Sequence, residues 1–123
     1  MDDEEFKNEL ISRCRGEMDE IDVSFQMIER PLQLFKIAMH QCGYEVKRAW
    51  VNMFLNIELS REIEGGIAFQ KLFHLTWQNE DGDVCISMWN PHVREEDRYT
   101  FIRTEDDFRE ALLDFTSKGF IQI

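Results

Sequence analysis

The chain of 123 residues is 43% hydrophobic and 32% charged and contains ten Phe and three Trp, a composition typical of a globular domain and unlike that of a disordered segment. Twenty-five acidic residues against fourteen basic ones give a net charge of −11. The basic residues are scattered, which excludes the clustered Lys and Arg that direct nucleic-acid binding requires, and the apolar runs are too short to cross a membrane.

The cysteines and the first residues indicate a cellular compartment. The sequence begins MDDEEF, which is acidic where a secretory signal peptide is basic. Cys14, Cys42 and Cys85 are widely spaced and odd in number, unlike a disulfide framework. We therefore expect a cytoplasmic protein with reduced thiols packed as small apolar side chains.

The first forty residues carry an apolar stripe with steps of three or four residues, which predicts a helix. Gly16 and Pro31 weaken this prediction, and the alternation of apolar and polar residues over 21–29 also fits a strand. We favour a helix because the stripe continues in phase across Pro31, and we expect it to end at Gly43. The stripe consists of Phe6, Leu10, Cys14, Met18, Ile21, Phe25, Ile28, Leu32, Phe35 and Met39.

From Met18 to Met39 the apolar steps also match a heptad repeat. This stripe therefore has two possible roles. It is the face that packs on a sheet, or part of it pairs with a second copy of the chain in a homodimer.

The middle of the chain alternates with a period of two residues and predicts four antiparallel strands joined as a meander. The first runs from Val51 to Ile63, with Phe54 as an apolar exception, and Gly65-Gly66 forms the first hairpin turn. The second covers 67–77, where Ile67, Phe69, Phe73, Leu75 and Trp77 are expected on one side and Lys71 is the exception. Residues 84–89 and 99–103 complete the sheet, with a turn at Asp81-Gly82 between the second and third strands.

The C-terminal region has the signals of a capped helix. Thr104 precedes three acidic residues, a typical helix start, and Lys118-Gly119 is a typical end. Residues 120–123 are expected to form a short terminal strand. The predicted fold is a single α+β domain over residues 1–123: an N-terminal helical region, a four-stranded antiparallel meander, a C-terminal helix and a short strand.

Candidate metal sites are incomplete in the sequence. The acidic stretch 79–83 lacks the Glu that a calcium loop requires at its twelfth position, so we interpret it as a hairpin turn. His40, Cys42, Cys85 and His92 offer four zinc ligands, but their spacing matches no compact zinc motif. We therefore expect neither a metal nor another cofactor.

Catalytic motifs are equally incomplete. Cys42 or Cys85 could form a nucleophile pair with His74 or His92, but no glycine-rich oxyanion loop lies nearby. His74 has the parity of a solvent-facing strand residue. We therefore expect a protein that is not an enzyme.

Aromatic and acidic residues suggest a protein-binding surface instead. Trp50, Phe54 and Trp89 are candidate anchors, unless the helical region covers that face of the sheet. The candidate acidic rim consists of Glu58, Glu62, Glu64, Glu80, Asp81, Asp83, Glu95, Glu96 and Asp97.

Two functions fit this pattern. The leading hypothesis is a non-enzymatic acidic protein-binding module that blocks a basic partner protein, in the manner of an inhibitor, immunity or anti-defence protein. The alternative is a small acidic homodimeric chaperone or adaptor that holds a segment of a client protein.

Overall fold

The computed structural model describes the backbone of residues 2–52, 54–80 and 83–123; for residues 12–25, 79, 80, 83 and 84 only the backbone is described. The strands form one antiparallel sheet in the order β1-β2-β3-β4-β5. The elements are α1 (Asp3–Gln41), β1 (Glu45–Val51), β2 (Phe54–Ile63), β3 (Gly66–Glu80), β4 (Asp83–Trp89), the 3-10 turn η1 (Glu95–Asp97), β5 (Tyr99–Ile102) and α2 (Glu105–Ser117).

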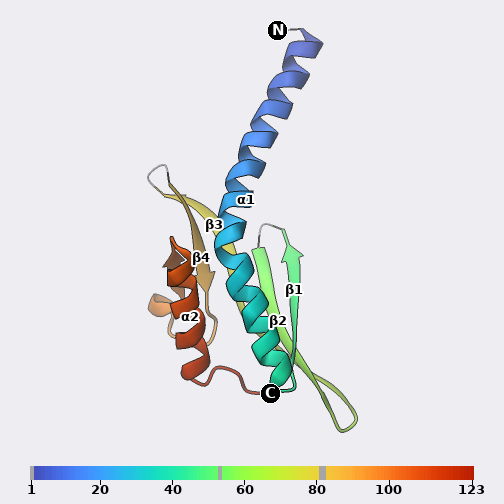
Figure 1. Ribbon diagram of the computed structural model, residues 1–123, viewed down its shortest axis with the longest axis vertical. Helices are drawn as coiled ribbons and strands as arrows, with labels where there is room; N and C mark the ends of the chain where they lie inside the picture. The colour runs from blue at the N-terminus through green and yellow to red at the C-terminus, as the bar shows by residue number, and fades with distance from the viewer. Residues whose placement is uncertain (1, 53, 81–82) are drawn as a thin grey trace.

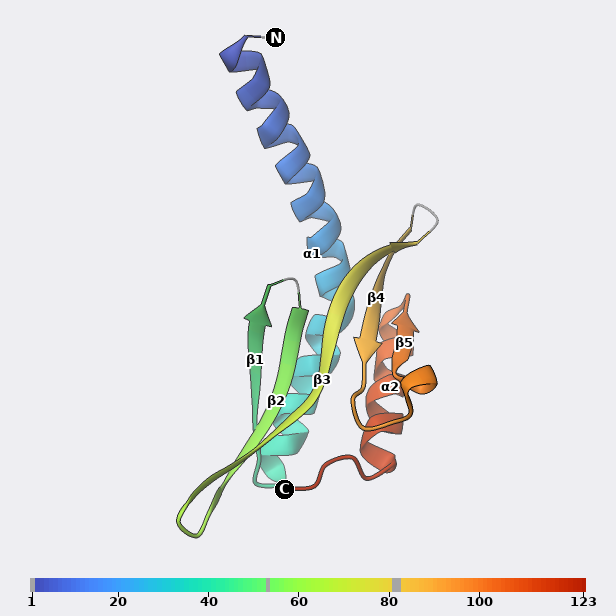
Figure 2. The same ribbon diagram turned by 180° about the vertical axis from the view of Figure 1, so that it is seen from behind.

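The molecule has two layers (Figures 1 and 2). The C-terminal half of α1 and the whole of α2 lie side by side on one face of the sheet, and neither helix covers the other face. The core lies between the layers and draws on both helices and all five strands. The predicted α+β fold is confirmed.

Helix α1 is one continuous helix of 39 residues, so residues 21–29 are helical and Pro31 does not end the helix. The carboxylate of Asp2 caps its start by accepting a hydrogen bond from the backbone N–H of Glu5 (2.8 Å). Gly43 follows its end with φ +90°, a conformation that favours glycine.

The apolar stripe of α1 has two different environments. Its C-terminal residues are buried on the sheet, whereas the N-terminal half of the helix extends well beyond the sheet (Figures 1 and 2). The part of the Met18–Met39 stripe from Ile28 onward therefore belongs to the core of the chain itself. The buried members are Ile28, Leu32, Phe35 and Met39.

The sheet has five strands rather than four, because residues 45–51 form an additional edge strand, β1. Val51, the predicted start of the first strand, is the last residue of β1. Asn52 has φ +57° in the turn that follows, and β2 starts at Phe54. The charged sequence EVKRAWV lacks the apolar alternation that would have predicted this strand. Val46 is its one buried residue, because an edge strand packs against fewer neighbours.

A β-bulge in β3 corrects the predicted faces of that strand. Ile57 pairs with Phe73 but the next residue, Glu58, pairs with Lys71, so Leu72 is inserted between them. An inserted residue reverses which side chains point to which side. Phe69 is accordingly 62% exposed while Phe73 is fully buried, and the prediction that they share a side was wrong.

The C-terminal region matches its capping prediction. Thr104 and Asp107 form a capping box at the start of α2, and Gly119 follows the helix with φ +72°. Residues 120–123 do not pair as the predicted strand. The side chain of Gln70 holds this segment instead, by donating to the carbonyl of Phe120 and accepting from the backbone N–H of Gln122 (2.8 Å), so a side chain replaces a strand partner.

An ion pair joins α1 to the edge strand. The Arg48 guanidinium donates to both carboxylate oxygens of Glu29, at 2.8 and 3.2 Å. This hydrogen bonding lowers the pKa of Glu29 below its ordinary value. Both side chains are about one-third exposed, so solvent screening limits the energy of the pair.

We expect Arg48→Met to lower the free energy of unfolding by about 0.5–1 kcal/mol at pH 7. Because the folded-state pKa of Glu29 is lowered, the ion pair stabilises the fold above the unfolded pKa near 4.5 and loses this effect as the pH falls further. Urea unfolding at pH 7 and pH 3 should therefore show the difference between the proteins shrinking in acid. Arg61→Met, at an exposed position of β2, is the control and should cost less.

Candidate functional site: the open face of the sheet

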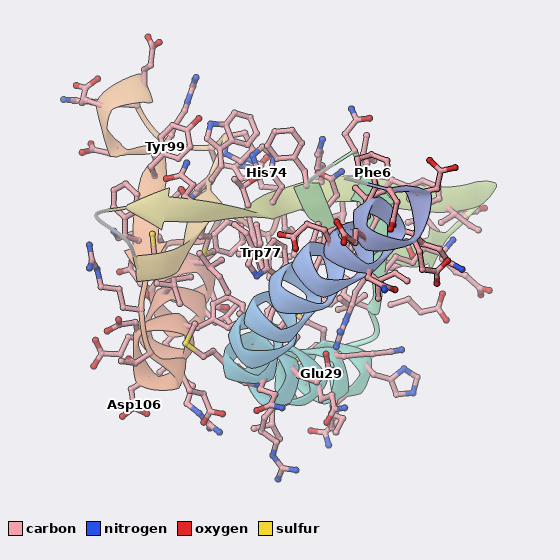
Figure 3. All side chains as sticks on the ribbon, turned by 90° about the horizontal axis from the view of Figure 1, so that it is seen from above. Phe6, Glu29, His74, Trp77, Tyr99 and Asp106 are labelled. Carbon is pink, nitrogen blue, oxygen red and sulfur yellow. The ribbon has the colours of Figure 1, made fainter. Side chains whose placement is uncertain are left out.

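The sheet face without helices carries a stack of three rings from neighbouring strands. The imidazole of His74 on β3 stacks on Trp89 of β4, with centroids 4.5 Å apart and planes 16° apart. On its other side it contacts Phe54 of β2, at a centroid distance of 4.7 Å. In Figure 3 His74 and Tyr99 point away from the helices, whereas Trp77 lies on the helix side.

Exposed apolar side chains extend this stack across the sheet. Tyr99 pairs with Trp89 and Phe101 pairs with Ser87 in the β4–β5 register, so both lie on the same face as His74. They are 56% and 46% exposed. We call this surface the open-face patch, and it consists of Val51, Phe54, His74, Trp89, Tyr99 and Phe101.

The environment of His74 favours its neutral form. Burial lowers its pKa most, because the charged imidazolium loses water, and the nearby Lys71 lowers it further. Lys71 shares the open face with His74, although the two are three residues apart, because the bulge at Leu72 lies between them. At neutral pH the stack is therefore uncharged.

We expect the imidazole of His74 to titrate below its ordinary pKa of 6.5 in NMR spectra of the folded protein. Trp89→Ala removes one wall and should move the midpoint upward. Because the folded-state pKa is lowered, this group destabilises the fold as the pH falls below 6.5, and His74→Gln should remove that part of the pH dependence of the Tm. A midpoint at or above 6.5 in the unmodified protein would contradict the described burial.

The three predicted anchors do not share one face. Phe54 and Trp89 belong to the open-face patch and both contact His74. Trp50 lies on the helix side, where its ring stacks on Trp77 with centroids 5.3 Å apart. Two of the three candidate anchors therefore lie in the open-face patch, and the third lies on the opposite face.

The predicted acidic residues are spread over several places. Glu58 lies within the open face, opposite Lys47 on β1 and Lys71 on β3. The group in η1 adjoins the open-face patch at the β5 edge (Figures 2 and 3). Glu62 lies near the end of β2, and Glu64 lies in the β2–β3 hairpin turn that follows. Glu95, Glu96 and Asp97 form η1. Asp81 lies outside the described residues, as do the side chains of Glu80 and Asp83.

Sequence inspection did not single out Tyr99 and Phe101. Their signal is the alternation in YTFI, where Ile102 is buried and the two aromatic residues point the other way. The partner strand β4 gives the complementary signal, since Trp89 faces Tyr99. The register of these two short strands therefore places both aromatic residues beside Trp89 and Ser87.

The candidate metal and nucleophile residues occupy separate environments. Cys42 is exposed at the end of α1, and Cys85 is buried in β4. The His92 ring stacks on Phe120 and its Nε2 lies 3.2 Å from the carbonyl oxygen of Lys71, so it packs against the C-terminal segment. Among the residues that the structure describes, no group of three His, Cys, Asp or Glu side chains is placed to hold a metal ion.

A groove of about 350 Å³ lies between α1 and α2. Its lining is mostly apolar, with Leu34, Phe35 and Leu113 among the wall residues. The charged side chain in this lining is Arg109, which forms an ion pair with Glu105 (3.0 Å). The groove therefore has packing surface but no constellation for acid–base or nucleophilic chemistry.

No protein-family model matches this chain, and no curated protein or solved structure gives a match. Within the described part of the chain, no helix combines the length and apolar character needed to span a membrane. The site must therefore be interpreted from its own geometry.

Proposed function

We propose that this chain is a non-enzymatic acidic protein-binding module that docks on a basic partner protein through the open-face patch and blocks it. The observation that carries the proposal is the cluster of exposed aromatic side chains on a sheet face that no helix covers. Contiguous apolar patches on a protein surface are typical of interaction sites, and Trp and Tyr are the residues that most often dominate binding energy.

The sign of the charge selects the kind of partner. A net charge of −11 attracts a basic surface over a distance and accelerates its encounter. The acidic turn η1 adjoins the patch at Tyr99 (Figure 3), so a partner seated on the rings brings its basic residues near these carboxylates. Blocking follows because a partner surface covered by this sheet is closed to its own ligand.

The test compares three baits in quantitative affinity purification from the native host, each immobilised as the full chain. The unmodified protein should retain a basic protein that the double variant Trp89→Ala, Tyr99→Ala loses. Trp50→Ala is the matched control, since it removes an exposed Trp from the opposite face and should retain the partner.

When binding is measured with the purified partner, each alanine substitution in the patch should weaken it by about 2 kcal/mol, which is roughly thirtyfold in Kd. The association rate should fall steeply between low and high salt, because screening removes the long-range attraction. If the double variant and Trp50→Ala bind alike, or if the retained protein is acidic, the proposal is wrong.

A further inference from the structure

In the projecting half of α1, residues 3–25, the structure describes the side chains of residues 3–11, and the apolar ones among them are exposed. Phe6 and Leu10 are 57% and 54% exposed, and Ile11 beside them is also exposed. Leu10 and Ile28 are 18 positions apart, which is five turns of an α-helix, so both lie on the same helix face. That face is fully buried on the sheet at Ile28 and uncovered at Leu10.

The sequence continues this stripe without a gap between its two halves. Cys14, Met18, Ile21 and Phe25 occupy the intervening positions at helical spacing, and the backbone is helical throughout. Helices without tertiary contacts are marginally stable in water, and a sustained apolar seam on such a helix is typical of one that pairs with another helix. The exposed Phe6 and Leu10, together with the unbroken helical spacing of the apolar residues, therefore favour a helical partner.

Charge decides between a second copy and a different protein. Acidic residues occupy both ends of this segment, and basic residues lie mainly in its middle. With nine acidic and three basic residues, residues 2–25 carry a net charge of −6, so two copies paired in either direction would bring segments of like charge together. The acids are Asp2, Asp3, Glu4, Glu5, Glu9, Glu17, Asp19, Glu20 and Asp22; the bases are Lys7, Arg13 and Arg15.

We propose that the projecting half of α1 is a docking surface for an amphipathic helix of another protein, with an apolar seam flanked by Lys and Arg. The seam supplies the buried contact, and the flanking bases neutralise the acidic blocks that oppose self-pairing. This surface lies on α1 and not on the open face, so it does not depend on the patch proposed above.

The test uses the full chain and two synthetic helical peptides of three heptads, with Leu at the seam positions and either Lys or Glu at the flanking positions. Isothermal titration calorimetry should show binding of the Lys peptide at least about tenfold tighter than that of the Glu peptide. Leu10→Ala should weaken binding of the Lys peptide by about tenfold or more in Kd. Leu113→Ala, which alters a side chain 70% exposed on α2, is the matched control and should leave the affinity unchanged.

Trp89→Ala separates this inference from the proposed function, because it removes one ring of the open-face patch and should leave peptide binding intact. Circular dichroism confirms that each variant keeps its helices. The inference is overturned if the Lys peptide does not bind, or if Leu10→Ala and Leu113→Ala bind it alike, which would indicate unspecific charge attraction. It is also overturned if sedimentation equilibrium shows a homodimer that Leu10→Ala dissociates, since the occupant would then be a second copy.

Discussion

Phe73→Ala is expected to lower the free energy of unfolding by about 3–5 kcal/mol, the range for deleting a fully buried Phe ring. Phe73 is fully buried, and its ring meets Phe115 of α2 edge to face at a centroid distance of 5.3 Å. The substitution would open a cavity between the sheet and α2, where backbone movement cannot readily fill it. Urea unfolding followed by circular dichroism and by tryptophan fluorescence measures the loss.

Phe69→Ala is the matched control, since it makes the same change four residues earlier on the same strand. Its ring is exposed on the opposite side of the sheet, so the expected loss is below about 1 kcal/mol. Similar losses for the two variants would show that the two rings share a face and that the β3 bulge is absent. The pair therefore tests the feature that separates the structure from the sequence-based prediction.

The elements with local signals were predictable. The Gly65-Gly66 turn, the Thr104 cap and the end of α2 at Lys118-Gly119 each depend on residues within a few positions. The bulge does not, because it is defined by pairing with β2. The one sign of the bulge in the sequence was Lys71, a charged residue at a position where the period-two pattern predicted an apolar one. In the structure Lys71 lies on the open side of the sheet together with Phe69.

The hairpin between β1 and β2 explains why Trp50 lies on the opposite face of the sheet from Phe54 and Trp89. A strand read continuously from Val51 to Ile63 puts positions 50 and 54 on one side, because they differ by four residues. The turn at residue 52 interrupts the alternation of sides along the chain. As a result Trp50 pairs with Leu55, and Val51 pairs with Phe54. The side of Trp50 therefore depends on where the turn lies, which the charged sequence of β1 conceals.

The open-face patch was predictable only in part, because its residues come together through the pairing of different strands. Phe54 stood out as an apolar residue on a polar parity, and Trp89 as an aromatic at a strand end. The patch itself arises from cross-strand register, which brings His74 between these two rings and sets Tyr99 beside Trp89. Composition gave the sign of the expected partner's charge but not the docking face.

The length of α1 relative to the sheet explains why its stripe has two environments. A helix of 39 residues is about 58 Å long at 1.5 Å per residue. Strands β1 and β4, which α1 contacts, have seven residues each and span only about 23 Å. The spacing of the apolar residues shows that one face is apolar, but the length of the strands decides how much of that face the sheet can cover.

Ile28→Ala is expected to lower the free energy of unfolding by about 2–5 kcal/mol, because Ile28 is fully buried where α1 first meets the sheet. Leu10→Ala should change it by less than about 0.5 kcal/mol, since Leu10 is exposed and Ala is at least as good a helix former. The two substitutions lie on the same helix face and differ only in whether the sheet covers them. An Ile28 variant therefore tests the core rather than self-association.

Urea unfolding of both variants at one protein concentration gives the comparison, and a tenfold dilution series checks that neither midpoint depends on concentration. If Leu10→Ala costs as much as Ile28→Ala at every dilution, the N-terminal half of α1 packs against its own chain. The stripe would then have no free surface, and no partner helix could bind there. If the Leu10→Ala effect is small and the helix content is kept, the seam remains available for the basic helix that we propose.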